Sequence, residues 1–238
     1  MHRLLSLLLA SLMLVAAEVP AAQANEYIIL SGGPARKYFE TRKRNPHDRY
    51  WGNFVDTAVQ RMAALKGKLG KDDTIGWLVY RPAYIERGHE DGQDYIKMIK
   101  SMVAALDAQT EFDIKLLWFE STSQLVNYLN KGNNRPENKI IGFEFYGHSN
   151  KACFMFDYSS DVDGGSVAFL HQNQLSAIDR DAFAPDAFAQ SFGCHSGESY
   201  SRAWRARFGF PMIGAIGKTD YSAGGIPFPS SAGGKWVK

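Results

Sequence analysis

The sequence predicts an α/β fold, with a mostly parallel sheet that carries helices on both faces. Short apolar runs of strand length alternate with longer segments whose apolar residues recur at helical spacing. This alternation is typical of parallel sheets, because two parallel strands need a long crossover between them. No repeat and no linker divides residues 25–220, so we expect a single domain over residues 25–238.

Each element has a local signal in the chain. Apolar runs predict strands at 26–31, 74–82, 112–119, 140–146, 187–193 and 210–217, and a short returning strand at 152–158. Helical spacing predicts helices at 51–70, 91–106, 121–132 and 197–209, with a shorter one at 171–178. Pro82 ends the second strand, and residues 159–166 form a polar turn. The Gly-, Pro- and Ser-rich segment 218–238 is predicted to be a flexible loop or tail, which could also cover a cleft as a specificity loop.

The first residues have the pattern of a signal peptide. A basic start (His2, Arg3) precedes an apolar stretch over 4–17, and residues 22–24 read Ala-Gln-Ala, a typical cleavage site. The apolar stretch is shorter than the roughly 20 residues that a membrane span needs, although an uncleaved anchor is the alternative. We therefore predict a signal peptide over 1–24, export to a periplasm or secretion, and no membrane span after cleavage.

The charge of the chain restricts its partners. The formal net charge is +2, which does not favour a strongly acidic partner. One basic cluster could meet phosphate or lipid headgroups, but a solvated loop is the simpler interpretation, so no nucleic-acid partner is predicted. The cluster consists of Arg36, Lys37, Arg42, Lys43 and Arg44.

Two chemically reactive residues follow two predicted strands. His148 comes after the strand 140–146, and Cys194 comes after the strand 187–193. Ligands of open parallel sheets bind beyond the carboxyl ends of the strands, so both residues should meet at one edge. A thiolate is a nucleophile, and an imidazole can take its proton and later protonate a leaving amine. A helix that starts just after Cys194 would favour negative charge there, and the amides of Ser149 and Cys194 are candidates for an oxyanion hole.

These motifs resemble the caspase-like (clan CD) cysteine peptidases, and are nearest to legumain-type and bacterial caspase-like domains. The runs "IIGFEFYGH" and "AFAQSFGC" resemble the two strands of that family that end in a His and a Cys, and 46 positions separate the two residues. "SNKACFMFDY" is similar to the hairpin after the His of legumain, and "CHSGES" to the run after its nucleophile. The resemblance covers roughly residues 74–217. It implies a caspase-like three-layer sandwich and a thiol-dependent peptidase acting on a protein or peptide, with Cys194 as the nucleophile and His148 as the general acid/base.

Two positions depart from the family pattern. The family usually has Gly directly after its His, where this chain has Ser149, with Gly147 on the other side of the His. The residue before the Cys is commonly Ala in the family, and here it is Gly193. Neither difference removes a reactive group, but both bear on activity more than on fold.

Other interpretations of the same residues stay open. Exported proteins with two cysteines commonly pair them, and a Cys153–Cys194 disulfide would close a loop of about 40 residues, worth about 4 kcal/mol. The domain would then be a catalytically inactive binding or scaffold domain, or would be opened by reduction. Zinc bound by both cysteines with His148 and His195 is disfavoured, because the spacing fits no zinc ribbon or finger.

Two further motifs are incomplete, and we expect neither a metal nor a cofactor. The run "GAIGKT" at 214–219 has Met212 where a phosphate-binding loop needs Gly. The run "DVDGG" at 161–165 lacks the late Glu of a calcium loop.

The partners of the reactive pair are less defined. Asp107 or Asp113 could orient His148, and Glu144 could pair with a basic group. A specificity pocket could use any of four side chains, and the sequence does not select among them. These are Arg81, Arg87, Asp220 and Tyr221.

Overall fold

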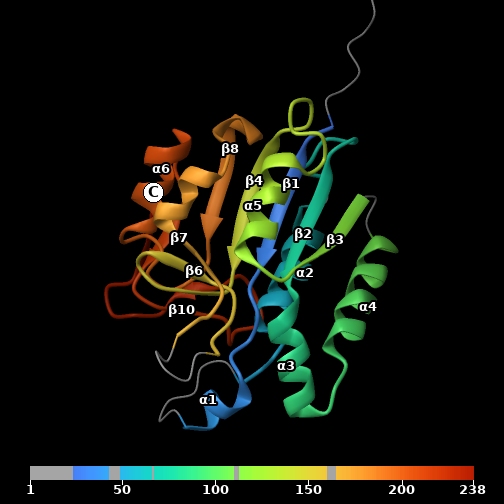
Figure 1. Ribbon diagram of the computed structural model, residues 1–238, viewed down its shortest axis with the longest axis vertical. Helices are drawn as coiled ribbons and strands as arrows, with labels where there is room; N and C mark the ends of the chain where they lie inside the picture. The colour runs from blue at the N-terminus through green and yellow to red at the C-terminus, as the bar shows by residue number, and fades with distance from the viewer. Residues whose placement is uncertain (1–23, 43–48, 66, 110–112, 160–164) are drawn as a thin grey trace, which may run out of the picture.

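The computed structural model describes residues 24–42, 49–65, 67–109, 113–159 and 165–238. Its centre is a five-stranded, all-parallel sheet in the order β3-β2-β1-β4-β8. Figure 1 shows these strands side by side, with their carboxyl ends toward the lower part of the picture. The strands are β1 (Glu26–Ser31), β2 (Thr74–Tyr80), β3 (Asp113–Phe119), β4 (Ile140–Tyr146) and β8 (Phe183–Ser191). The α/β fold class is therefore confirmed.

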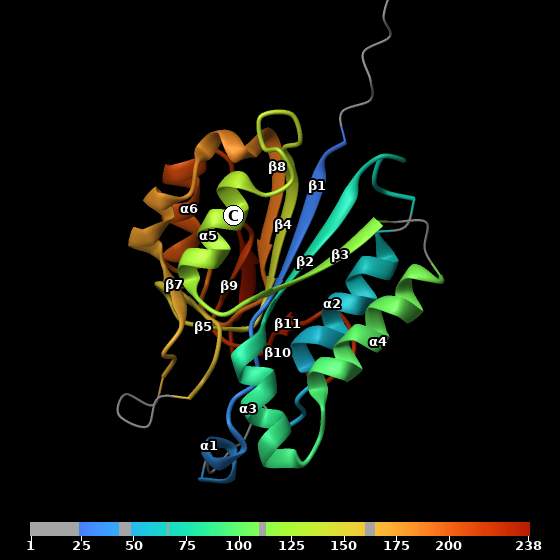
Figure 2. The ribbon, with the colours of Figure 1, turned by 45° about the vertical axis from the view of Figure 1, so that its right-hand side comes forward.

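Helices cover both faces of the sheet and make a three-layer arrangement (Figure 2). Because successive strand residues point to opposite faces, β1 sends Ile28 and Leu30 into one core and Tyr27 and Ile29 into the other. The first core lies under α5 (Thr122–Lys131) and α6 (Tyr200–Phe208). The second core lies under α2 (Asn53–Ala64) and α4 (Tyr95–Asp107).

Side-chain caps explain where two of the helices begin. The Ser121 hydroxyl accepts the Gln124 N–H at the start of α5, and the Asp94 carboxylate accepts the Lys97 N–H at the start of α4. These bonds satisfy backbone donors that a helix leaves unpaired in its first turn.

Two helices were not predicted from the sequence. Pro82 does not merely end β2, since it lies in the first turn of α3 (Arg81–Asp91), where its missing N–H costs nothing. The basic cluster contributes to α1 (Lys37–Arg42) instead of forming a loop. Its first members make ion pairs with the acidic end of α3, Arg36 with Glu90 and Lys37 with Asp91. Lys43 and Arg44 lie outside the described residues.

A small antiparallel sheet follows β4. It contains β5 (His148–Ser149), β6 (Cys153–Met155) and β7 (Phe169–His171), so the returning strand predicted after His148 is confirmed. The short helix predicted next is a 3-10 helix, η1 (Gln172–Ala177), and a second one, η2 (Arg180–Ala182), leads into β8. The calcium-like run 161–165 lies almost wholly outside the described residues.

The segment after α6 differs from the prediction. The expected sixth strand contains β9 (Gly214–Ile216), which pairs with β12 (Lys235–Val237) and is not part of the central sheet. It still lies against β8, because the Ser191 N–H donates to the Ile213 carbonyl and the Ile213 N–H to the Ala189 carbonyl. A second pair joins β10 (Thr219–Asp220) and β11 (Phe228–Pro229). The segment 218–238, predicted to be a flexible loop or tail, thus contains paired strands.

The predicted signal peptide over 1–24 lies, except for residue 24, outside the described residues. Within the described part of the chain, none of the helices has the length and apolar character that crossing a membrane requires.

Candidate functional site

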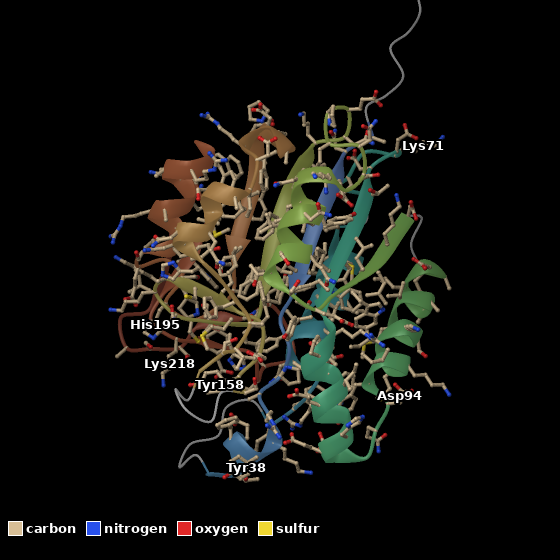
Figure 3. The ribbon with its side chains drawn as sticks, in the orientation of Figure 1. Tyr38, Lys71, Asp94, Tyr158, His195 and Lys218 are labelled. Atoms are coloured by element: carbon tan, nitrogen blue, oxygen red, sulfur yellow. The ribbon has the colours of Figure 1, made fainter. Side chains whose placement is uncertain are left out.

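A cavity of about 1070 Å³ lies beyond the carboxyl ends of β4 and β8. His148 and Cys194 both line it, as the sequence predicted from their positions at neighbouring strand ends. Figure 3 shows three other lining residues, Tyr158, His195 and Lys218, toward the lower left, whereas Lys71 lies at the upper end of the molecule. The fold therefore brings the two predicted reactive groups into one solvent-accessible space.

The imidazole of His148 is held between aromatic side chains. His148 is 8% exposed, and its ring meets the ring of Phe54 at right angles, with the centroids 5.0 Å apart. The ring of Tyr158 lies on another side, 5.3 Å away. Phe54 comes from α2 and Tyr158 from the segment after β6, so two distant parts of the chain fix the plane of the imidazole. Neither aromatic residue was predicted as part of the site, because Phe54 fits the buried face of a helix equally well.

The thiol of Cys194 is half-buried and contacts Thr219 of β10. The Thr219 N–H donates to the Cys194 sulfur across 3.4 Å, and the Thr219 hydroxyl lies 3.5 Å from the same atom. A backbone N–H that points at a sulfur stabilises negative charge on it. Thr219 was not singled out in the sequence, because a contact across 25 positions leaves no local pattern.

The backbone turns sharply directly after Cys194. His195 has a φ of 60°, a left-handed conformation that is uncommon for residues other than Gly. Its N–H donates to the Gly217 carbonyl, which fixes the turn. α6 begins only at Tyr200, so the prediction of a helix starting just after Cys194 is corrected, and a helix terminus does not account for the environment of the thiol.

Ser149 and Gly193 fit together between the ends of β4 and β8. The Ser149 hydroxyl donates to the Cys194 carbonyl across 2.5 Å. A Cβ atom added to Gly193 would lie 2.3 Å from that hydroxyl oxygen and 2.7 Å from the Ser149 Cβ. There is room for one side chain here, and Ser149 supplies it.

The Ser149 N–H also has a defined direction. The Asn150 N–H donates to the Cys153 carbonyl at the turn between β5 and β6. Hydrogen-bonded pairs alternate with other pairs along an antiparallel ladder, so the Ser149–Phe154 pair is of the second kind. The Ser149 N–H therefore points away from β6.

Tyr221 connects the two strand ends from the C-terminal segment. Its hydroxyl accepts the Gly147 N–H at 3.3 Å and donates to the Phe192 carbonyl at 3.2 Å. The Tyr221 ring meets the Phe54 ring edge-on, with the centroids 5.0 Å apart, and the Phe54 ring also contacts His148. The segment predicted to be a loose tail thus forms a wall of the cavity.

A charged group lies beside the cavity at His195. The His195 Nδ1 is 2.5 Å from a carboxylate oxygen of Glu198, whose other oxygen is 2.8 Å from the Lys151 ammonium. Hydrogen bonds from Lys151 and then His195 lower the pKa of Glu198 from 4.5 to about 2. This carboxylate therefore stays ionised down to strongly acidic pH. The His195 side chain is partly exposed and lines the cavity.

Cys153 and Cys194 are both free thiols in this structure. Cys153 lies in β6 opposite His171, and burial raises the pKa of its thiol. The described residues contain no group of three or more His, Cys, Asp or Glu side chains placed to hold a metal ion.

The suggested partners of the site are only partly brought to it. Asp113 begins β3 and Asp107 ends α4, so both belong to the opposite end of the sheet, and neither lines the cavity. Glu144 does pair with a basic group, Arg61 of α2, but in the core and not in the cavity.

Of the four candidates for a specificity pocket, two line the cavity and two do not. Asp220 and Tyr221 are part of its wall. Arg81 pairs instead with Glu120, and Arg87 with Asp91.

Comparison of the chain with protein-family models, with curated proteins and with solved structures finds no match.

Proposed function

We propose that this chain is a thiol-dependent peptidase of caspase-like type, with Cys194 as the nucleophile and His148 as the general acid/base. The observation that carries the proposal is the placement of both residues on one cavity, at the carboxyl ends of neighbouring parallel strands. Strand ends of this kind are where α/β proteins bind ligands. A base and a thiol that share such a site are the minimal apparatus for covalent acyl transfer.

The chemistry follows from the groups present. His148 takes the proton of the Cys194 thiol, and the thiolate attacks the carbonyl carbon of a peptide bond. The His148 proton passes to the leaving amine, and water then hydrolyses the thioester and regenerates the thiol. The Thr219 N–H donates to the sulfur and helps to hold it in place at the edge of the cavity.

The oxyanion needs donors in place before reaction. The Ser149 N–H points away from the β5–β6 ladder and immediately follows His148, which supports its role as one donor. The Cys194 N–H is the second candidate. The hydrogen bond between the Ser149 hydroxyl and the Cys194 carbonyl ties these two backbone segments together.

The enzyme is expected to act on proteins or peptides after export, in a periplasm or outside the cell. A cavity of about 1070 Å³ is large enough for several residues of an extended chain. Both aromatic and charged side chains line it, among them Tyr50, Tyr158, Asp220 and Lys218.

Thiol labelling of the natively exported, mature protein tests the proposal. The protein is treated with iodoacetamide without reductant from pH 5 to 9, and mass spectrometry measures the alkylation rate of each cysteine. We expect Cys194 to react quickly at pH 6, and His148→Ala to slow this reaction by about 100-fold, in the range of general-base catalysis. Cys153, whose thiol pKa is raised by burial, is an internal control in the same molecule.

Two results would contradict the proposal. One is a Cys194 that reacts at the rate of an ordinary thiol in both the wild type and the His148→Ala variant. The other is a Cys153–Cys194 peptide that resists labelling until reductant is added, which would indicate a disulfide-locked binding domain. If Cys194 is activated, incubation with a peptide library identifies the bonds that are cleaved, with Cys194→Ala as the inactive control.

A further inference from the structure

The two departures from the pattern of the resembling family meet at one point in the structure. Ser149 stands where a Gly is usual, and Gly193 where an Ala is usual. A Cβ at Gly193 would also lie 3.1 Å from the Gly147 carbonyl, on top of its overlap with the Ser149 side chain. Real Cβ atoms essentially never approach within 3.0 Å of another heavy atom, so any side chain at residue 193 would force Ser149 or the adjoining backbone to shift.

We propose that Ser149 is a positioning residue for Cys194, and that Ser149 and Gly193 act as one unit that sets the nucleophile against His148. The inference rests on the proposed function, because it assigns a role in placing the reactive thiol. Ser149 does not act on the sulfur itself. It acts through the backbone of Cys194, whose carbonyl accepts its hydroxyl across 2.5 Å.

Two further hydroxyl groups hold the peptide that precedes Cys194. The Ser196 hydroxyl donates to the Gly193 carbonyl at 2.9 Å, and the Gly193 N–H donates to the Ser191 hydroxyl at 3.3 Å. Ser191 and Ser196 are both fully buried. These bonds fix the path of the chain on the β8 side, but neither of them crosses to the strand that carries His148.

Of these three hydroxyl groups, that of Ser149 is the one that bonds across to the other strand end, where the Tyr221 hydroxyl also bridges Gly147 and Phe192. Ser149 is covalently next to His148, and its hydroxyl bonds the residue that carries the sulfur. The relative position of the base and the nucleophile therefore depends in part on this hydrogen bond and its side-chain contact, together with the Tyr221 bridge and the Phe192 N–H that donates to the Phe145 carbonyl. Displacements of about 1 Å between reacting groups can lower a rate by about 100-fold, so a small change at this point should reach the chemistry.

This arrangement makes a testable prediction about exchange. Gly193→Ala alone places a methyl group on the Ser149 hydroxyl and forces the two strand ends apart. Ser149→Gly alone leaves the space empty and removes the bond. Combining them, as Ser149→Gly with Gly193→Ala, puts one small side chain back between the strands from the other side, in the order that the resembling family has.

The experiment measures the rate of Cys194 alkylation by iodoacetamide at pH 5 to 9 in the folded, mature protein. We expect Ser149→Ala to lower the rate at pH 6 by about tenfold, as for the loss of one well-placed hydrogen bond. Gly193→Ala should lower it by about 100-fold, and the double variant should recover at least about tenfold over Gly193→Ala. Gly225→Ala is the matched control, because a Cβ there meets nothing within 4 Å.

Folding is followed separately by circular dichroism and thermal unfolding for every variant. If Gly193→Ala fails to fold, Ser149→Ala and Ser149→Gly still test the role of the hydroxyl. A merely structural role would lower the melting temperature and leave the pH profile of Cys194 alkylation in the folded protein unchanged, and that result would overturn the inference. A double variant no faster than Gly193→Ala would overturn the claim that the two residues form a unit.

The outcomes also separate this inference from the proposed function. If wild-type Cys194 reacts no faster than an ordinary thiol, the proposed function fails and no positioning role remains to be assigned. If wild-type Cys194 is activated and depends on His148, but all Ser149 variants match it, the peptidase proposal stands and the inference fails.

Discussion

The two ends of the central sheet hold their polar groups in different ways. At the amino end, the Glu26 carboxylate is fully buried and forms an ion pair with Arg135, which is 3% exposed, while the Tyr128 hydroxyl donates to the same carboxylate. At the carboxyl end, the Cys194 thiol and the His148 imidazole border a cavity open to solvent. At one end the polar groups are paired with each other in the core, and at the other they line a space that a ligand can enter.

The difference shows which contacts should matter for stability and which for chemistry. A buried charge that loses its partner is strongly destabilising, so the amino end should be sensitive in unfolding experiments. The carboxyl end borders an open space, so substitutions of its residues should change the reactivity of Cys194. Four changes test this division, taken from the largest expected effect to the smallest.

Cys194→Ala should have the largest effect, and only on chemistry. Removing the nucleophile of a covalent mechanism lowers the rate by about 10⁴-fold or more, whereas the half-buried thiol makes few stabilising contacts. Peptide cleavage and thermal unfolding of the same sample measure the two quantities. Cys153→Ala is the matched control and should keep its activity; a loss of activity in that variant would contradict the assignment of the nucleophile.

Arg135→Met should show the reverse pattern. It leaves the Glu26 carboxylate buried without its cation, and we expect the free energy of unfolding to fall by about 3–5 kcal/mol. Urea unfolding measures this loss. The alkylation rate of Cys194 in the folded fraction should not change.

A second variant controls for the loss of packing. Glu26→Gln combined with Arg135→Met removes both charges and should recover most of the stability, because no uncompensated charge remains. Equal losses in the single and double variants would show that the charge pair is not what stabilises the amino end.

Tyr221→Phe should affect both properties, moderately. It removes the hydroxyl that bonds the Gly147 N–H and the Phe192 carbonyl, at a cost of about 1 kcal/mol. Because these bonds join the two strand ends, Cys194 alkylation should also slow by a few fold. Tyr95→Phe, which removes a hydroxyl bonded to Asp91 away from the cavity, should lower stability and leave alkylation unchanged.

Glu198→Gln should have the smallest effect, a small loss of stability above pH 4.5 that disappears in acid. The folded-state pKa of Glu198 is lowered to about 2 from 4.5, so its ion pairs contribute stability above pH 4.5, and this contribution is lost as the pH falls toward 2. The stability of the wild type should therefore decline more steeply over this range than that of the variant. Parallel stability curves between pH 5 and 2 would contradict a role for this carboxylate.

The local sequence pattern was enough to predict the bounds of a strand where both faces of that strand are buried. The bounds of β1 and β4 match the predicted strands at both ends, because strands covered on both faces read as continuous apolar runs. His148 and Cys194 could be found from the same pattern, since each stands just beyond such a run. α3 was missed because Pro82 was taken as the end of a strand, although proline is also common in the first turn of a helix.

Long-range contacts could not be predicted in this way. Thr219 and Tyr221 reach the site because β12 pairs with β9 and β10 pairs with β11. The local sequence of this segment, which is rich in Gly, Pro and Ser, does not predict these pairings. Ser149 and Gly193 could each be noticed in the sequence, but only as separate irregularities. Their fit to each other depends on the distance between two strand ends, which cannot be derived from the sequence alone.

The late position of the cavity wall in the chain has a consequence for the order of synthesis. All five strands of the central sheet have been made once the ribosome has passed Ser191, whereas Thr219, Tyr221 and β12 are made afterwards. A nascent chain therefore contains every strand of the central sheet before it contains α6, which covers one core, or the wall beside Cys194. The reactive centre is thus completed by residues that are synthesised after all five strands of the scaffold sheet.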